Sequence, residues 1–158
     1  MGRALADLTE LDLSRDVIPD EELRRLVPHD YEFKMLDGIC HLDLERGLVI
    51  GYKSFGEDAW WARGHVPGQP VMPGVLMIEG CAQAAAVLMK KREGWGADKF
   101  IALGGVDKAR FRDIVVPPVK MYFASGVGTR GSRMFRYPAQ AFVDGKMVME
   151  MDLLGVLF

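Results

Sequence analysis

The sequence contains few of the residues that build redox and metal centres. It has two cysteines, Cys40 and Cys81, and three histidines among its 158 residues. No CxxC motif and no cluster of cysteine and histidine has the spacing of zinc ligands, so we expect no metal site. Both cysteines stand among apolar residues. This pattern predicts buried free thiols, not a disulfide or a nucleophile.

An excess of charge of one sign is also missing. The formal net charge is -2, from 20 Lys and Arg against 22 Asp and Glu. A chain without a basic excess has no bulk attraction to nucleic acid or to an anionic membrane. We therefore expect no nucleic-acid partner.

A long hydrophobic run that could cross a membrane is absent as well. The N-terminus carries Arg3 and Asp7 among scattered leucines, unlike a signal peptide. The most apolar stretch, residues 71–89, is interrupted by Glu79 and Gln83. A membrane span rarely places a carboxylate at its centre, so this stretch predicts a buried helix. We expect no membrane span and a cytoplasmic location.

One long helix is predicted in the middle of the chain, over residues 73–93. Pro73 and Gly74 suit its first turn, and Gly94 suits a left-handed cap after its last. Three basic residues near the end complement the helix dipole. The helix is apolar or small on nearly all sides, so most of its surface should be buried.

The remaining segments alternate in the manner of strands. Residues 31–54 predict a hairpin that turns at Arg46-Gly47. Further strands are predicted over 100–112, 118–127, 133–143 and 146–156. The pattern predicts an α+β fold, with an antiparallel β-sheet wrapped around one long central α-helix. Residues 1–27 are predicted as an N-terminal extension with a short helix, and 28–158 as the single domain.

Glu79 is the most unusual residue in the predicted helix. A carboxylate in an apolar surrounding is costly unless it is paired or protonated, and burial would raise its pKa toward that of a general acid. A buried glutamate that bonds to the backbone or to another subunit is an equal alternative. Gln83 follows one turn later on the same face and could orient the carboxylate.

His65 lies in a loop rich in glycine and proline, which could hold its imidazole rigidly at the mouth of a pocket. A lone histidine is more often structural, and we interpret His29 as a surface or turn residue and His41 as a strand residue. Gly74 begins the helix, where free amides could bind a carbonyl oxygen that gains negative charge. Base, acid and oxyanion donor together suit proton abstraction beside a carbonyl.

A long segment around these residues resembles a known family, the 3-hydroxyacyl-acyl-carrier-protein dehydratases of fatty-acid synthesis (FabZ type). The segment is Gly64-His65-Val66-Pro67-Gly68-Gln69-Pro70-Val71-Met72-Pro73-Gly74-Val75-Leu76, continuing to Glu79 and Ala82-Gln83-Ala84. Two shorter similar segments are Pro28-His29 with Asp37, and residues 105–112 with Val116-Pro117. The resemblance covers roughly residues 27–156.

The resemblance implies a hot-dog fold and dimers, often assembled into hexamers, with His65 of one subunit facing Glu79 of the other. It implies that His65 removes the C2 proton, Glu79 protonates the departing C3 hydroxyl and the Gly74 amide polarises the thioester carbonyl. No metal or organic cofactor is then needed, because the thioester itself acidifies C2. Val66 stands where the family usually has Phe and would alter the pocket wall.

A basic strip is the candidate binding site for an acidic carrier protein. Lys108, Arg110 and Arg112 should share one strand face by alternation. An ordinary solvated strand face explains the same pattern equally well.

The sequence leaves two other functions open. One is a hot-dog acyl thioesterase, which would use a carboxylate and water. The other is a non-catalytic acyl-binding relative, which would be expected to lack His65 or Glu79. The leading hypothesis remains dehydration of a thioester that is linked to acyl carrier protein or to CoA.

Overall fold

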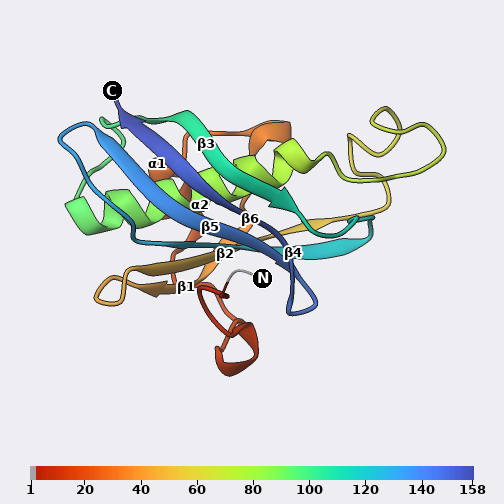
Figure 1. The fold of residues 1–158 in the computed structure, drawn as a ribbon, viewed down its shortest axis with the longest axis horizontal. Coiled ribbons are helices and arrows are strands. Elements are labelled where there is room, and N and C mark those ends of the chain that lie inside the picture. The colour runs from red at the N-terminus through yellow and green to blue at the C-terminus, as the bar shows by residue number, and fades with distance from the viewer. Residues whose placement is uncertain (1–2) are drawn as a thin grey trace.

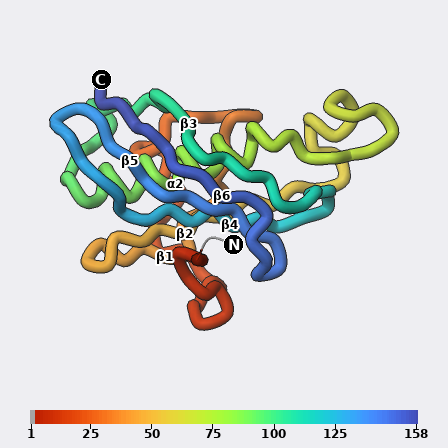
Figure 2. The backbone as a smooth tube through the Cα atoms, viewed as in Figure 1, coloured from red at the N-terminus to blue at the C-terminus, as the bar shows by residue number. Residues whose placement is uncertain are grey.

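A six-stranded antiparallel sheet curves around one long helix in the computed structural model, which describes residues 3–158 (Figures 1 and 2). The strands are β1 (Gly38–Asp43), β2 (Leu48–Phe55), β3 (Ile101–Phe111), β4 (Val119–Gly126), β5 (Met134–Val143) and β6 (Lys146–Leu157). Their order is β1-β2-β4-β5-β6-β3, so β1 and β3 are the edges of the sheet. The helices are α1 (Asp20–Leu26) and α2 (Gly74–Glu93), with short 3-10 turns at Leu8–Glu10 and Tyr31–Phe33.

The long helix α2 begins and ends where its local sequence predicts. Pro73 caps it in an extended conformation, and Gly94 ends it at a φ of 67° with its N–H bonded to the Lys90 carbonyl. Glycine is needed there because other residues resist a positive φ. The prediction of a sheet wrapped around one helix is confirmed.

The predicted turn at Arg46-Gly47 is also confirmed, and a second turn at Asp144-Gly145 joins β5 to β6, while the first hairpin starts later than expected. Gly47 has a φ of 71°, and Asp144 and Gly145 have φ values of 49° and 75°. The hairpin predicted from residue 31 begins at Gly38, because the Asp30 side chain accepts a hydrogen bond from the Tyr31 amide and starts a 3-10 turn.

The main core lies between α2 and the concave face of the sheet. Phe123 and Phe135 are fully buried there, as is Leu88 of the helix. Gly80 lets α2 approach β4 closely, because a Cβ at this position would lie 2.5 Å from the Phe123 ring. This contact fixes the depth of the helix, and with it the position of the neighbouring Glu79.

The N-terminal segment packs on the outer face of the sheet (Figure 1). Leu8 of this segment joins a second apolar cluster with Ile50 and Phe142. The buried Gln140 side chain accepts a hydrogen bond from the Leu5 amide and donates one to the Arg3 carbonyl. Among residues 3–158, no helix is long and apolar enough to cross a membrane.

Replacing Gly80 with alanine should destabilise the protein, although alanine favours helices by about 1 kcal/mol over glycine. The new methyl group would overlap the Phe123 ring, and overpacking of this kind costs about 1–3 kcal/mol. We expect the free energy of unfolding of Gly80→Ala to fall by about 1 kcal/mol or more in urea titrations. Adding Phe123→Leu should recover part of this loss, since it removes the overlapped ring. A Gly80→Ala variant more stable than wild type would contradict the close contact.

Candidate active site

Glu79 projects from the second turn of α2 and is held by one of its two oxygens. Its Oε1 accepts a hydrogen bond from Gln83 Nε2 at 2.8 Å and lies 3.4 Å from His29 Nε2. Among residues 3–158, Oε2 has no hydrogen-bond donor from the protein. The carboxylate is 23% exposed, so Oε2 is available to a ligand while Oε1 fixes the orientation of the group.

Gln83 is the buried residue that holds the carboxylate. Its side chain is 1% exposed, and its Oε1 accepts a hydrogen bond from the Met35 amide at 3.1 Å. Its Nε2 donates to the Phe33 carbonyl at 2.7 Å and to Glu79. Because Oε1 must face an N–H donor, the amide cannot flip, and Nε2 always faces Glu79. The predicted contact between Glu79 and Gln83 is confirmed.

His29 lies beside Glu79, which corrects our interpretation of it as a surface or turn residue. Its side chain is 30% exposed, and its Nδ1 is buried without a hydrogen-bond partner among the described residues. The contact joins residues 50 positions apart, so local sequence could not predict it. In the sequence, only the family resemblance at Pro28-His29 pointed to this residue, and it assigned no role to His29.

His65 sits in the loop between β2 and α2 with its imidazole exposed. Its Nδ1 lies 2.7 Å from the Val71 carbonyl oxygen, which can only accept a hydrogen bond. Nδ1 therefore carries the proton, and the lone pair of Nε2 is free to act as a base. The loop extends beyond the N-terminal end of α2 (yellow-green in Figure 1). Over residues 3–158 no hydrogen bond or ion pair joins His65 to Glu79 within one chain.

Gly74 is the first residue of α2, as predicted, but its lack of a side chain has a packing reason as well. A Cβ at Gly74 would lie 2.6 Å from the ring of Phe111. Gly74, Val75 and Phe111 line one side of a cavity of about 620 Å³ that is partly open to solvent. The helix amides point toward this end of α2. Val66 is partly buried, one residue from His65.

The predicted alternation of the three basic residues on β3 is wrong at Lys108. The pairing of β3 with β6 shifts between Asp107 and Arg110, and Lys108 has a φ of 54°. The inserted residue forms a β-bulge, which sequence alternation does not reveal.

Two of the three basic side chains are already paired. Lys108 lies 3.2 Å from Asp152, and Arg112 forms an ion pair with Glu150. Lys108 and Arg110 line one concavity together with these two carboxylates. This surface is therefore of mixed charge and not a purely basic strip.

Comparisons with known proteins agree with the fold and show the family to which the chain belongs. The sequence model of the FabA-like domain matches residues 27–152. A 3-hydroxyacyl-acyl-carrier-protein dehydratase FabZ of Clostridium botulinum is 37% identical over 142 residues, which cover 86% of this chain and 93% of the relative. FabZ of Rickettsia felis is 34% identical over 141 residues, covering 89% of this chain and 97% of the relative.

Solved structures are similar in fold at low sequence identity. The dehydratase heterocomplex ApeI:P of Xenorhabdus doucetiae has a TM-score of 0.69 at 15% identity, covering 85% of this chain and 90% of that one. The Escherichia coli PaaI protein has a TM-score of 0.58 at 13% identity, covering 75% and 80%. The prediction of a hot-dog fold is confirmed.

Both cysteines should resist thiol reagents in the folded protein. Both are free and buried, as predicted, and burial raises the pKa of Cys40 to about 11 and that of Cys81 further. The reactive thiolate is therefore scarce below pH 9. We expect slow labelling by Ellman's reagent at pH 8, and two thiols per chain after unfolding in urea. Because both thiols ionise more easily in the unfolded chain, stability should fall as the pH rises from 9.0 toward 11. Rapid labelling of native protein would contradict this burial.

Replacing Gln83 with leucine should destabilise the protein and release Glu79. The substitution leaves the Met35 amide and the Phe33 carbonyl without their buried partner, at a cost of about 1–3 kcal/mol for each unpaired group. We expect the free energy of unfolding of Gln83→Leu to fall by about 2 kcal/mol or more in urea titrations. Gln69→Leu is the matched control, since Gln69 is exposed in the loop. Equal stability of the two variants would contradict the structural role of Gln83.

Proposed function

Because this chain belongs to the FabA-like family and has FabZ dehydratases among its relatives, we propose that it is a hydro-lyase of fatty-acid or related lipid synthesis. It converts (3R)-3-hydroxyacyl-acyl-carrier-protein to the trans-2-enoyl thioester and water. The observation that carries this proposal is the state of Glu79. One oxygen is fixed by a buried amide, and the other accepts no hydrogen bond from residues 3–158 and can face a ligand.

The reaction needs two proton transfers, one to a base and one from an acid. Nε2 of His65 takes the C2 proton, which the neighbouring thioester carbonyl makes acidic. Glu79, protonated on Oε2, gives its proton to the C3 hydroxyl, which leaves as water while the C2=C3 double bond forms. Free amides at the start of α2, including that of Gly74, polarise the thioester carbonyl as negative charge develops on its oxygen.

The surroundings of each group favour its charged product. After the transfer Glu79 is a carboxylate, and the Gln83 amide donates to it at 2.8 Å, with His29 beside the same oxygen. The protonated His65 keeps its Nδ1–H bonded to the Val71 carbonyl. Charged groups gain more from such hydrogen bonds than neutral ones, so both contacts strengthen as the reaction proceeds. All of these steps use protein groups alone.

The site is proposed to be shared between the two subunits of a homodimer, which can assemble further into a trimer of dimers. His65 and Glu79 are not joined within one chain, and the His65 loop extends away from α2 (Figure 1). The helix face that carries Glu79 is only partly covered, and Val75 on the same face is 67% exposed. A second copy over this face could cover Val75 and bring its own His65 to Glu79.

The natural substrate is proposed to be linked to acyl carrier protein, with Lys108, Arg110 and Arg112 at the docking surface. The pairing of Lys108 and Arg112 with acidic residues of β6 reduces their attraction for an acidic partner. Arg110 forms no ion pair within the described part of the chain and is the main docking residue in this proposal.

His65→Ala and Glu79→Gln should each lower the rate of dehydration by about 10²–10⁴-fold, the contribution of a general base or acid. The absorbance of the enoyl thioester measures the reaction in either direction. His41→Ala, which changes a partly exposed histidine outside the site, should keep wild-type activity. Release of free thiol without hydration or dehydration by the wild-type protein would indicate a thioesterase instead.

Mixing the two inactive variants tests the shared site. After unfolding and refolding of equal amounts together, half of the dimers contain one copy of each variant. Each such dimer has one site with both groups intact, so activity should recover to roughly a quarter of wild type. No recovery, with the dimers formed, would place both groups of a site in one subunit. Comparison of carrier-linked and CoA-linked substrates then identifies the natural thioester.

A further inference from the structure

His29 places an imidazole ring beside Glu79, and the proposed reaction gives this ring no proton to transfer. The residue lies in the segment that links α1 to β1. Its Nε2 is 3.4 Å from Oε1 of Glu79, the oxygen that accepts a hydrogen bond from Gln83. Two nitrogen atoms therefore lie beside Oε1, whereas Oε2 accepts no hydrogen bond from residues 3–158.

The surroundings of the ring determine which of its nitrogens carries the proton. Nδ1 of His29 is buried and has no hydrogen-bond partner in the described part of the chain. A proton on Nδ1 would be a buried donor without an acceptor, which folded proteins avoid. A proton on Nε2 faces the Glu79 carboxyl group instead. The ring therefore presents an N–H, and not a lone pair, to Oε1.

A donor at Nε2 also affects where Glu79 holds its own proton. A carboxyl oxygen that bears a proton is itself a donor, and the N–H groups of Gln83 and His29 need an acceptor. Oε1 is then the acceptor, and the proton of the acid is on Oε2, which can face a ligand. With the proton on Nδ1, the lone pair of Nε2 would accept from Oε1 and hold the proton of the acid away from the substrate.

The length of the contact suits a hydrogen bond that tightens during the reaction. At 3.4 Å, Nε2 and Oε1 are further apart than the roughly 2.9 Å of a well-formed N–H···O bond. No hydrogen bond from residues 3–158 holds Nδ1, and His29 borders a small cavity of about 200 Å³, so the ring has room to move. The carboxylate that forms when Glu79 loses its proton attracts a donor about twice as strongly as the neutral acid does. An interaction that strengthens only at this stage raises kcat and leaves substrate binding unchanged.

We propose that His29 is a positioning residue for the acid of this site and acts through Oε1 of Glu79. Its Nε2–H directs the transferable proton to Oε2 and stabilises the carboxylate that remains after the transfer. The proton passes from Oε2 to the C3 hydroxyl, which leaves as water, while His29 keeps its own proton throughout. This inference rests on the proposed function and adds a residue to its acid.

Three substitutions of His29 separate a donor at Nε2 from the other properties of the ring. His29→Leu removes the donor, so kcat should fall by about ten- to a hundredfold, the worth of a hydrogen bond to a charged group, with KM unchanged. His29→Gln places an amide N–H near the position of Nε2 and should keep kcat within about threefold of wild type. His29→Asn carries its amide at the position of Nδ1, too short to reach Oε1, and should be as slow as His29→Leu. His41→Leu is the matched control on β1 and should keep the wild-type kcat.

The inference is overturned if His29→Gln is as slow as His29→Leu, or if all three variants keep the wild-type kcat. A rise in KM at unchanged kcat would also overturn it, since His29 would then bind the substrate and not the carboxylate. In the Glu79→Gln background, His29→Leu should cause no further loss, and an undiminished loss there would contradict action through Glu79. If His29→Leu fails to fold, the comparison of His29→Gln with His29→Asn decides alone.

The protonation sites of the rings separate this inference from the proposed function. The chain has three histidines, so nitrogen-15 labelling of histidine gives spectra that single substitutions can assign. Long-range proton–nitrogen NMR at pH 8 should show the proton of His29 on Nε2 and that of His65 on Nδ1, which are opposite tautomers. This result without any dehydratase activity would retain the donor and reject the reaction. Dehydratase activity with the His29 proton on Nδ1 would retain the reaction and reject the donor.

Discussion

The proposed site depends on the hydrogen bonds of one buried side chain, the amide of Gln83. It joins α2 to the segment before β1 through the Met35 amide and the Phe33 carbonyl, and its remaining N–H holds Glu79. Without this hydrogen bond, the Glu79 side chain would rotate so that its carboxylate faces solvent. Because both backbone partners are fixed, the position of Glu79 is set by the fold and not by the flexible side chain alone. The segment from Pro28 to Met35 is therefore part of the site, although it contributes no proposed catalytic group.

The depth of α2 in the sheet is a second constraint on the same carboxylate. Gly80 touches the Phe123 ring, and Gly74 touches the Phe111 ring, so close contacts on both sides of Glu79 fix the helix against β4 and β3. Glycine weakens a helix by about 1 kcal/mol relative to alanine. Here that cost is offset by the close approach that it allows. The helix start stays near a cavity, and Glu79 stays on the face that the sheet leaves partly open.

The parts of the site that sequence could predict are those whose causes are local. The ends of α2 follow from Pro73 and Gly94, and the bond between Glu79 and Gln83 follows from their spacing of one helical turn. His29 could not be found in this way, because its contact with Glu79 depends on how a distant segment folds against the helix.

The bulge at Lys108 also could not be predicted from the sequence, because it depends on how β3 pairs with β6. Alternation assumes that every strand residue has a partner, and an inserted residue breaks that count without changing the composition of the strand. The open face of α2 was also missed, since a helix that is apolar on nearly all sides was expected to be buried on most of them. In a single chain that face remains partly exposed at Ile78, Ala82 and Ala86.

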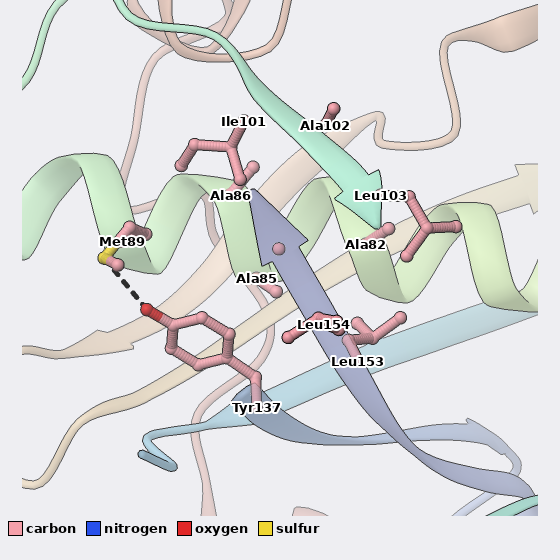
Figure 3. Close-up of a pocket in the computed structure, with 11 residues that line it drawn as sticks. Ala82, Ala85, Ala86, Met89, Ile101, Ala102, Leu103, Tyr137, Leu153 and Leu154 are labelled. Carbon is pink, nitrogen blue, oxygen red and sulfur yellow. Dashed lines mark hydrogen bonds between the residues drawn. The ribbon is translucent and has the colours of Figure 1, made fainter. Parts of the chain in front are cut away.

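From the start of α2 to its C-terminal half, the groups on this partly exposed face follow the same order as the groups of the proposed substrate. In the proposed reaction, the helix start provides amides for a carbonyl and Glu79 in the next turn provides an acid, while the alanines beyond it line an apolar space (Figure 3). A 3-hydroxyacyl thioester has the same order of groups, from its carbonyl through C3 to its alkyl chain. One helix could therefore bind the whole acyl group lengthwise and would need only a base from outside. In the proposed shared site, this requirement would account for the exposure of Val75 in a single chain. In the proposed dimer, closing this face within the chain would bury Glu79 away from the substrate and from His65, whereas closing it with a second copy would supply the His65 of that copy.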